Sequence, residues 1–406
     1  MLFKMKKLIL KKISIMLNIK NFIFLLFVVT YENIQSSQYG PTTFYNKPYS
    51  SEPYFFDSSI TFTAGQTNKA FNQNHETVPF LSQYGYEDFL NKFIDQTLSN
   101  DNITSQGHGE LSGKYEFEQL QLSLYKNIHN NLFIFITTSI DNLTVKSITA
   151  KFAPTEEPLT DNQIIYLEKL RKILPEEINQ SGMLTTGFYT GYKKTLESFE
   201  HLDFLQITLR VGILTPQCMY ENNDSILKYP FIANITFGYP IATIVSLGVL
   251  DHLNFGLYGL IIPYQPKTLF IPINNTPSHN QLLMTEKTMG TFSPKPFLTS
   301  TFYIEAHDPL NKFIGTIAYS YMYGLNWTIT PLKKTLISTD LINDTSLLAP
   351  RSSGAITFQF DYNMKNEKAP NAPMFSFFYA MDLNGMLTPK INVAGGTSNF
   401  QMSYDF

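Results

Sequence analysis

Apolar and polar residues alternate with a period of two in many segments of this chain. In the sharpest case, the C-terminal segment, one face carries Phe400, Met402, Tyr404 and Phe406. Such alternations last for roughly ten residues, the length of a tilted strand that crosses a bilayer. They predict strands with one apolar and one polar face. A half-buried strand of a soluble sandwich has the same pattern, so the pattern leaves the environment open.

The alternating segments predict about 12 strands, within a range of roughly 10 to 14. They are residues 55–64, 117–125, 132–139, 183–192, 205–213, 241–250, 253–262, 298–305, 312–324, 356–363, 375–382 and 399–406, with 283–291 as the weakest case. The tight Asp251-His252 link predicts that the two segments around it pair as a hairpin. Alternation is not clean between Asn102 and Gln119.

Two segments have helical periodicity instead. Thr160 and Gln163 form a capping box before an apolar stripe that Pro175 ends. Residues 86–98 place Phe89, Leu90 and Phe93 on one face. We expect both helices to pack at the rim of the sheet, and the alternative for 86–98 is a helix that plugs its interior.

The N-terminus has the order of a secretory signal peptide. Six lysines precede the short apolar run Phe22–Val29, and small residues follow at Ser36 and Ser37. The sequence therefore predicts a signal peptide at 1–37 and one mature domain at 38–406. Beyond Tyr31 there is no uninterrupted apolar stretch of the length that a spanning helix needs.

Composition narrows the function classes. The chain of 406 residues is 15% aromatic but only 16% charged, and aromatic residues favour sheets and membrane interfaces. A net charge of -3 gives no basic excess for a nucleic-acid partner. The single cysteine, Cys218, excludes an intramolecular disulfide and a cysteine-cluster metal site.

Candidate chemistry is sparse. No nucleophile elbow, phosphate loop or dinucleotide fingerprint is present, and the seven histidines are scattered, so we expect no enzyme activity, catalytic residue, metal or cofactor. The strand faces predict that Glu305, Asp361 and Asp382 point to the interior or the rim. Arg210, one of three arginines, lies within a strand. In a lumen it would pair with these carboxylates or select anions, and near a strand end it would anchor the interface.

The ending Phe400-Gln401-Met402-Ser403-Tyr404-Asp405-Phe406 resembles the last strand of bacterial outer-membrane β-barrel proteins, which ends in an aromatic residue after alternating apolar positions. The resemblance covers about nine residues. It implies a single closed antiparallel transmembrane β-barrel, an all-β fold, in the cell outer membrane. It also implies that Phe400, Met402, Tyr404 and Phe406 are recognised by the barrel assembly machinery.

A barrel of this kind brings both termini to the periplasmic side, so the long insertions Leu214–Ala233, Tyr264–Gln281 and Thr328–Ser353 are expected outside the cell. The favoured function is passive, porin-like transport of small solutes in contact with outer-membrane lipid. A narrow or plugged lumen fits the apolar inward residues Ile244 and Phe378. Two alternatives stay open: a structural or adhesive surface protein with an occluded barrel, and a soluble secreted β-sandwich.

Overall fold

The computed structural model describes residues 56–85, 87–88, 108–129, 131–152, 164, 168, 172, 174–197, 202–215, 236–249, 252–273, 286–308, 312–332, 338–364 and 372–402. Its main sheet has 13 strands, of which the two-residue β4 (Glu87–Asp88) only extends one edge. The other twelve are β1 (Phe56–Thr67), β5 (His108–His129), β6 (Leu132–Phe152), β7 (Glu177–Glu197), β8 (Phe204–Leu214), β9 (Ile241–Val249), β10 (Leu253–Ile262), β13 (Phe297–His307), β14 (Phe313–Gly324), β16 (Arg351–Asn363), β17 (Met374–Met386) and β19 (Asn392–Met402).

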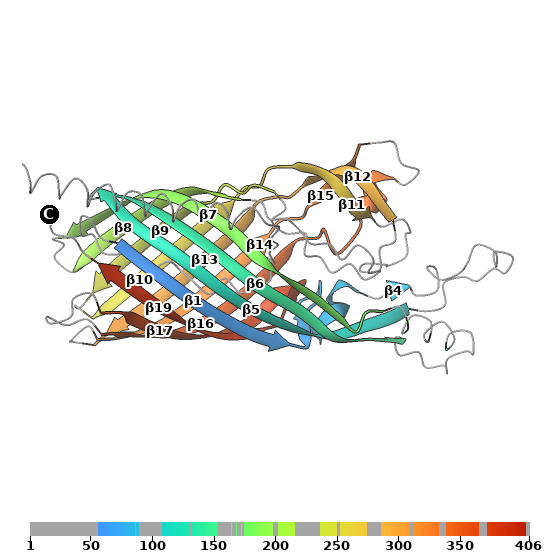
Figure 1. Ribbon diagram of the computed structural model, residues 1–406, viewed down its shortest axis with the longest axis horizontal. Helices are drawn as coiled ribbons and strands as arrows, with labels where there is room; N and C mark the ends of the chain where they lie inside the picture. Colours follow the sequence, from blue (N-terminus) through green and yellow to red (C-terminus); the bar gives the residue numbers. More distant parts are fainter. Residues whose placement is uncertain are drawn as a thin grey trace, which may run out of the picture.

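The twelve strands close into a barrel, because β1 pairs antiparallel with both the last strand, β19, and β5. Thr61 lies opposite Thr397 on one side and Gln121 on the other. The Thr61 and Thr397 hydroxyls are 2.9 Å apart where the first strand, β1, pairs with the last strand, β19. The prediction of an all-β, closed antiparallel barrel is confirmed, and Figure 1 shows its tilted strands.

The two ends of the barrel differ. Short links join β5 to β6 and β9 to β10 at the end where β1 begins and β19 finishes, here called the short-turn end. The opposite, long-loop end carries the connections from β1 to β5, β6 to β7, β8 to β9, β10 to β13 and β14 to β16. The predicted hairpin around Asp251-His252 is confirmed, with Leu253 opposite Val249.

One predicted wall strand is wrong. Residues 283–291 mostly form β12 (Glu286–Ser293), which pairs with β11 (Lys267–Ile273) and β15 (Thr328–Pro331) in a small separate sheet. This sheet lies at the long-loop end (Figure 1). Periodicity identifies a strand but not its partner, so the sequence could not separate β12 from the wall. The expected loops 264–281 and 328–353 therefore include structure, namely β11, β15 and helix α4 (Thr339–Asn343).

Large apolar side chains cover the outside of the wall. Those that are 38–65% exposed include Ile60, Phe62, Leu120, Leu122, Ile134, Leu209, Phe302, Ile317, Phe358, Phe377 and Phe400. On β8, exposed Ile207, Leu209 and Val211 alternate with buried Gln206, Thr208 and Arg210. The sandwich alternative is wrong, because the sheet is closed and its apolar flank faces outward. We call this surface the apolar belt.

On β5 and β6 the outer face changes from apolar to polar, and the inner face from polar to apolar, at the same height along the barrel. Toward the short-turn end, Leu120 and Leu122 point outward while Ser123 is buried inside. Toward the long-loop end, Glu116 and Glu118 lie on the outer face, and Tyr115 and Phe117 are buried. On β6 the same change occurs between exposed Ile140 and half-buried Asn142, which lie opposite Leu120 and Glu118. The wall therefore continues beyond the apolar belt, and there it surrounds an apolar core.

That core holds a plug made by the chain directly after β1. Strands β2 (Lys69–Phe71) and β3 (Thr77–Pro79) pair with each other and with β18 (Thr388–Pro389), and the 3-10 helix η1 (Phe80–Tyr84) follows. The Phe80 ring stacks on Tyr115 with centroids 5.0 Å apart. The Ser82 hydroxyl donates to the Leu111 carbonyl at 2.7 Å. Phe80, Leu81 and Tyr84 are buried in one cluster with side chains of β5, β6, β17 and β19.

The predicted plug helix 86–98 does not begin as a helix, because Glu87 and Asp88 form β4 against β5. The remainder of that segment lies outside the described residues. The sequence did not point to the residues 69–84 that form the described plug, because this segment has no helical periodicity. In the other predicted helix, the described residues Ile164, Glu168 and Lys172 are helical. Of the helices described, none has the length and apolar character to traverse a bilayer.

Candidate functional site: the barrel interior

At the height of the apolar belt, the inner face of the barrel is lined mainly by polar side chains. Buried residues of the inward face include Thr61, Ser123, Thr208, Ser246, Thr301, Thr316, Thr357 and Ser376. The four candidates from the sequence are also buried and inward: Arg210, Glu305 and Asp382 are 6–7% exposed and Asp361 is 0% exposed. They lie on four different strands, β8, β13, β17 and β16, and each has its own described partners.

Arg210 sits within an aromatic group. Its guanidinium carbon lies 4.9 Å from the ring centroid of Tyr189 on β7 and 5.5 Å from that of Phe135 on β6. Its Nη2 donates to the Tyr258 hydroxyl on β10 at 3.3 Å. Ring faces attract a cation, and the stacking fixes the side chain against the wall. Arg210 therefore presents a fixed positive charge to the interior midway along β8, well away from either strand end.

Glu305 belongs to a polar cluster near the short-turn end. Its Oε1 lies 2.7 Å from Nε2 of His307, two residues further along β13. Asn254, opposite Glu305 on β10, donates from Nδ2 to the same carboxylate oxygen at 3.3 Å. The opening at this end thus carries a carboxylate beside an imidazole.

The two aspartates have different settings. Asp361 accepts a hydrogen bond from Gln359 Nε2 at 2.7 Å, near the short-turn end of β16. Asp382 accepts bonds from the Ser353 hydroxyl and the Ile391 backbone amide, both at 3.1 Å. Ile391 and its neighbour Val393 belong to the apolar cluster around the plug. These bonds connect Asp382 on β17 to β16 and to the residue before β19, beside the plug.

Large inward aromatic rings lie over glycines of the neighbouring strand, which sequence reasoning missed. A methyl group added at each of these glycines would overlap the ring of the residue directly opposite. The pairs are Gly191 with Phe133, Gly212 with Tyr189, Gly248 with Phe204, Gly256 with Tyr303 and Gly395 with Phe378. Each ring rests on the wall instead of reaching across the barrel. Inward aromatic residues are therefore compatible with an open interior.

Several buried polar atoms of the interior have no partner within the described part of the chain. They are the hydroxyls of Thr63, Thr208 and Thr299 and the side-chain amide of Gln83 in η1. A buried polar group without a hydrogen bond costs about 1–3 kcal/mol, so such groups in a native fold meet ordered water or a ligand. These atoms add to the polar character of the inner face.

No group of three or more His, Cys, Asp or Glu able to hold a metal ion occurs among the residues described. Phe400 points outward and is 46% exposed, and Met402 is the last residue of β19. Tyr404 and Phe406 lie outside the described residues.

A closed antiparallel barrel with an apolar belt outside and polar side chains inside defines the class of transmembrane β-barrels. The fold is similar to that of the COG4313 outer membrane channel from Pseudomonas putida F1, with a TM-score of 0.51 and 9% identity over 88% of this chain and 100% of the other. The translocator domain of the autotransporter NalP from Neisseria meningitidis matches with a TM-score of 0.34 and 10% identity, covering 89% of this chain and 91% of that domain. No family model and no curated protein sequence matches the chain.

Proposed function

We propose that this protein is a bacterial outer-membrane channel through which small solutes diffuse passively. The observation that carries the proposal is the closed barrel whose inner face is lined mainly by polar side chains while its large apolar side chains face outward. The fixed charges of Arg210 and Glu305 are placed along that interior to act on charged solutes. The solved barrel of similar fold is described as an outer membrane channel.

In this proposal the short-turn end is periplasmic and the long-loop end is extracellular, as in single-chain bacterial barrels. Export depends on the N-terminal signal peptide. Insertion depends on the barrel assembly machinery, which reads the alternating ending that includes Phe400 and Met402. The apolar belt contacts outer-membrane lipid.

The test is reconstitution of the folded protein in planar bilayers, together with swelling of liposomes in uncharged sugars of increasing size. A channel gives discrete conductance steps and a size cut-off. Reversal potentials in a salt gradient then report the preference between anions and cations. Folded, heat-modifiable protein that gives neither conductance nor swelling would refute the channel.

A second candidate, a surface protein with an occluded barrel, is favoured by one observation. The plug residues Phe80, Leu81 and Tyr84 are packed in an apolar cluster at the long-loop end, where a solute must pass. In this case wild-type protein is closed, and protease or antibody reaches the small sheet of β11, β12 and β15 on intact cells. Conductance that appears only after the plug is loosened would support the occluded barrel.

A further inference from the structure

On the outer wall near the long-loop end, the seam between β1 and β5 opens into a recess. The two strands pair as far as Thr67 and Tyr115. The chain then turns inward, and Ala70 of β2 is buried in the plug, while β5 continues straight with β6. The separation leaves a cavity of about 800 Å³ between these strands and β3. Its size is within the range of sites for small organic ligands.

Lysines dominate the charge of this recess. Lys69, Lys114 and Lys151 line it, together with one carboxylate, Glu110. Lys69 and Lys151 are exposed, and their side chains form no ion pair with another described residue. A fourth lysine, Lys390, donates from Nζ to the Thr77 hydroxyl at the edge of the recess at 3.3 Å.

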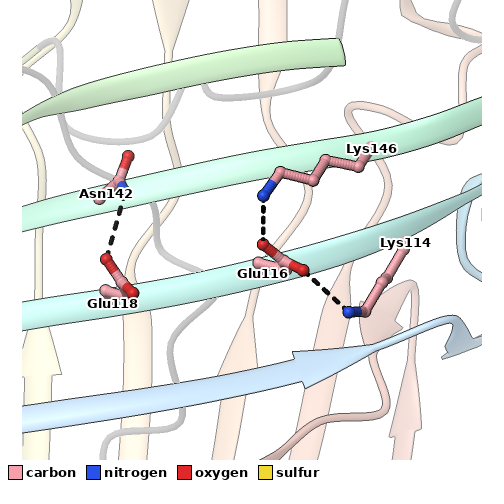
Figure 2. Close-up of polar contacts among 5 residues, drawn as sticks. All are labelled: Lys114, Glu116, Glu118, Asn142 and Lys146. Atoms are coloured by element: carbon pink, nitrogen blue, oxygen red, sulfur yellow. Dashed lines mark hydrogen bonds and ion pairs between the residues drawn. The ribbon is translucent and has the colours of Figure 1, made fainter. Parts of the chain in front are cut away.

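Lys114 is held in place by a network on the same outer surface (Figure 2). Its Nζ lies 2.9 Å from Glu116 Oε1, and Lys146 Nζ lies 2.8 Å from Glu116 Oε2. These bonds, with that from Lys114 as the largest cause, hold the pKa of Glu116 below its usual value. The single carboxylate of Glu116 is therefore shared by two lysines, and Glu177 and Glu118 also act on Lys146.

The position of the recess indicates its occupant. On the outer face of β5 the apolar belt ends at Leu120, and Lys114 is six residues beyond it. At about 3.3 Å per residue and a tilt of about 40°, this is roughly 15 Å above the last apolar row. Phospholipid phosphates lie directly above the acyl chains, whereas phosphorylated sugars of a glycolipid extend to this height. The side chains that alternate with Lys114, among them Tyr115, pack inside against the plug, so the recess faces away from the interior.

We propose that this lysine recess binds the phosphorylated saccharide of an outer-leaflet glycolipid. The ammonium groups of Lys69, Lys114 and Lys151 pair with phosphate, and the polar floor of Ser112, Thr67 and Thr77 bonds to sugar hydroxyls. The bound lipid anchors the barrel in the outer leaflet at the point where β1 and β5 stop pairing. This interaction rests on the proposed orientation, with the long-loop end outside the cell, and is independent of conduction through the interior.

The test is native mass spectrometry and fluorescence titration of the full-length barrel in detergent with lipopolysaccharide that has a phosphorylated core. The same glycolipid after phosphatase treatment and inorganic pyrophosphate are the comparison ligands. The Lys69→Gln/Lys151→Gln variant should weaken binding about 25-fold, since each basic residue near a charged lipid surface contributes about fivefold. The matched control is Lys126→Gln/Lys194→Gln, which removes two exposed lysines near the short-turn end and should bind like wild type.

Equal weakening by both double variants would show that net charge alone affects binding, and it would contradict binding of the glycolipid in the recess. Unchanged binding of the dephosphorylated glycolipid would overturn the phosphate contacts. Displacement by pyrophosphate at equal concentration would assign the recess to a free anion instead of a lipid. Heat-modifiable migration of each variant shows that the barrel is folded, and a barrel that binds but does not conduct leaves this inference intact.

Discussion

Gly256 on β10 and Tyr303 on β13 lie directly opposite each other, and the tyrosine ring occupies the space where a side chain of residue 256 would be. The ring is 1% exposed, and its hydroxyl lies 2.6 Å from the Ser246 hydroxyl on β9. The glycine and the hydroxyl together hold the ring flat on the inner wall across three strands. A large residue thereby covers the wall without narrowing the barrel.

Gly256→Ala should force the Tyr303 ring off the wall and into the interior. Overpacking of this kind costs about 1–3 kcal/mol, and the rotated ring also loses its bond to Ser246. We expect a lower free energy of unfolding in urea and a smaller single-channel conductance. The control is Gly259→Ala on the same strand, where an added methyl group meets nothing within 4 Å. Equal effects of the two changes would contradict the role of the ring.

In the proposed channel, Arg210 should set the preference between anions and cations. Arg210→Gln removes a buried positive charge from the interior, so we expect the anion-to-cation permeability ratio to fall several-fold in a salt gradient. Arg210→Lys keeps the charge but loses the planar stacking on Tyr189, and should give an intermediate ratio. Lys194→Gln removes one exposed positive charge of β7 and serves as the control. A ratio that is the same in all three variants would exclude a filter at Arg210.

The apolar belt should tolerate charge only near its edge. Leu209 is 51% exposed at the centre of β8, and Leu209→Arg should cost about 2–4 kcal/mol in lipid vesicles. Ile128 is 56% exposed near the end of β5, and Ile128→Arg should cost about 0–1 kcal/mol. Reversible unfolding in guanidinium measures both. If the two costs were the same, these positions would not differ in membrane depth.

Loosening the plug should widen the opening of the barrel at the long-loop end. Phe80→Ala removes the ring that stacks on Tyr115 and should cost about 3–5 kcal/mol of packing within the plug. We expect a larger conductance and a larger sugar cut-off, with the twelve-stranded wall still formed. Phe313→Ala is the control, because this aromatic residue is 44% exposed on the outside of β14. A closed wild type and an open Phe80→Ala variant would favour the occluded barrel over the open channel.

The wall strands within the belt were predictable because a bilayer outside and polar groups inside impose a period of two. The prediction fails on β5, where 117–125 was expected and His108–His129 was found. Beyond Glu118 the outer residues are polar and the inner ones, such as Phe117, are apolar, so the phase of the alternation reverses within one strand. A single amphipathic pattern cannot describe a strand that passes from lipid into water while its inner face passes from a polar interior onto a packed plug.

The sequence by itself determined the strand periodicity, the polar strand faces that carry Arg210, Glu305, Asp361 and Asp382, and the absence of an enzyme motif, since each depends on neighbours along the chain. Only the tertiary structure decided that β12 leaves the wall, that residues 69–84 form the plug, and that Tyr303 covers Gly256. These features depend on which strands pair and in which register. Strand pairing joins residues far apart in the chain, and the spacing of apolar residues carries no information on it.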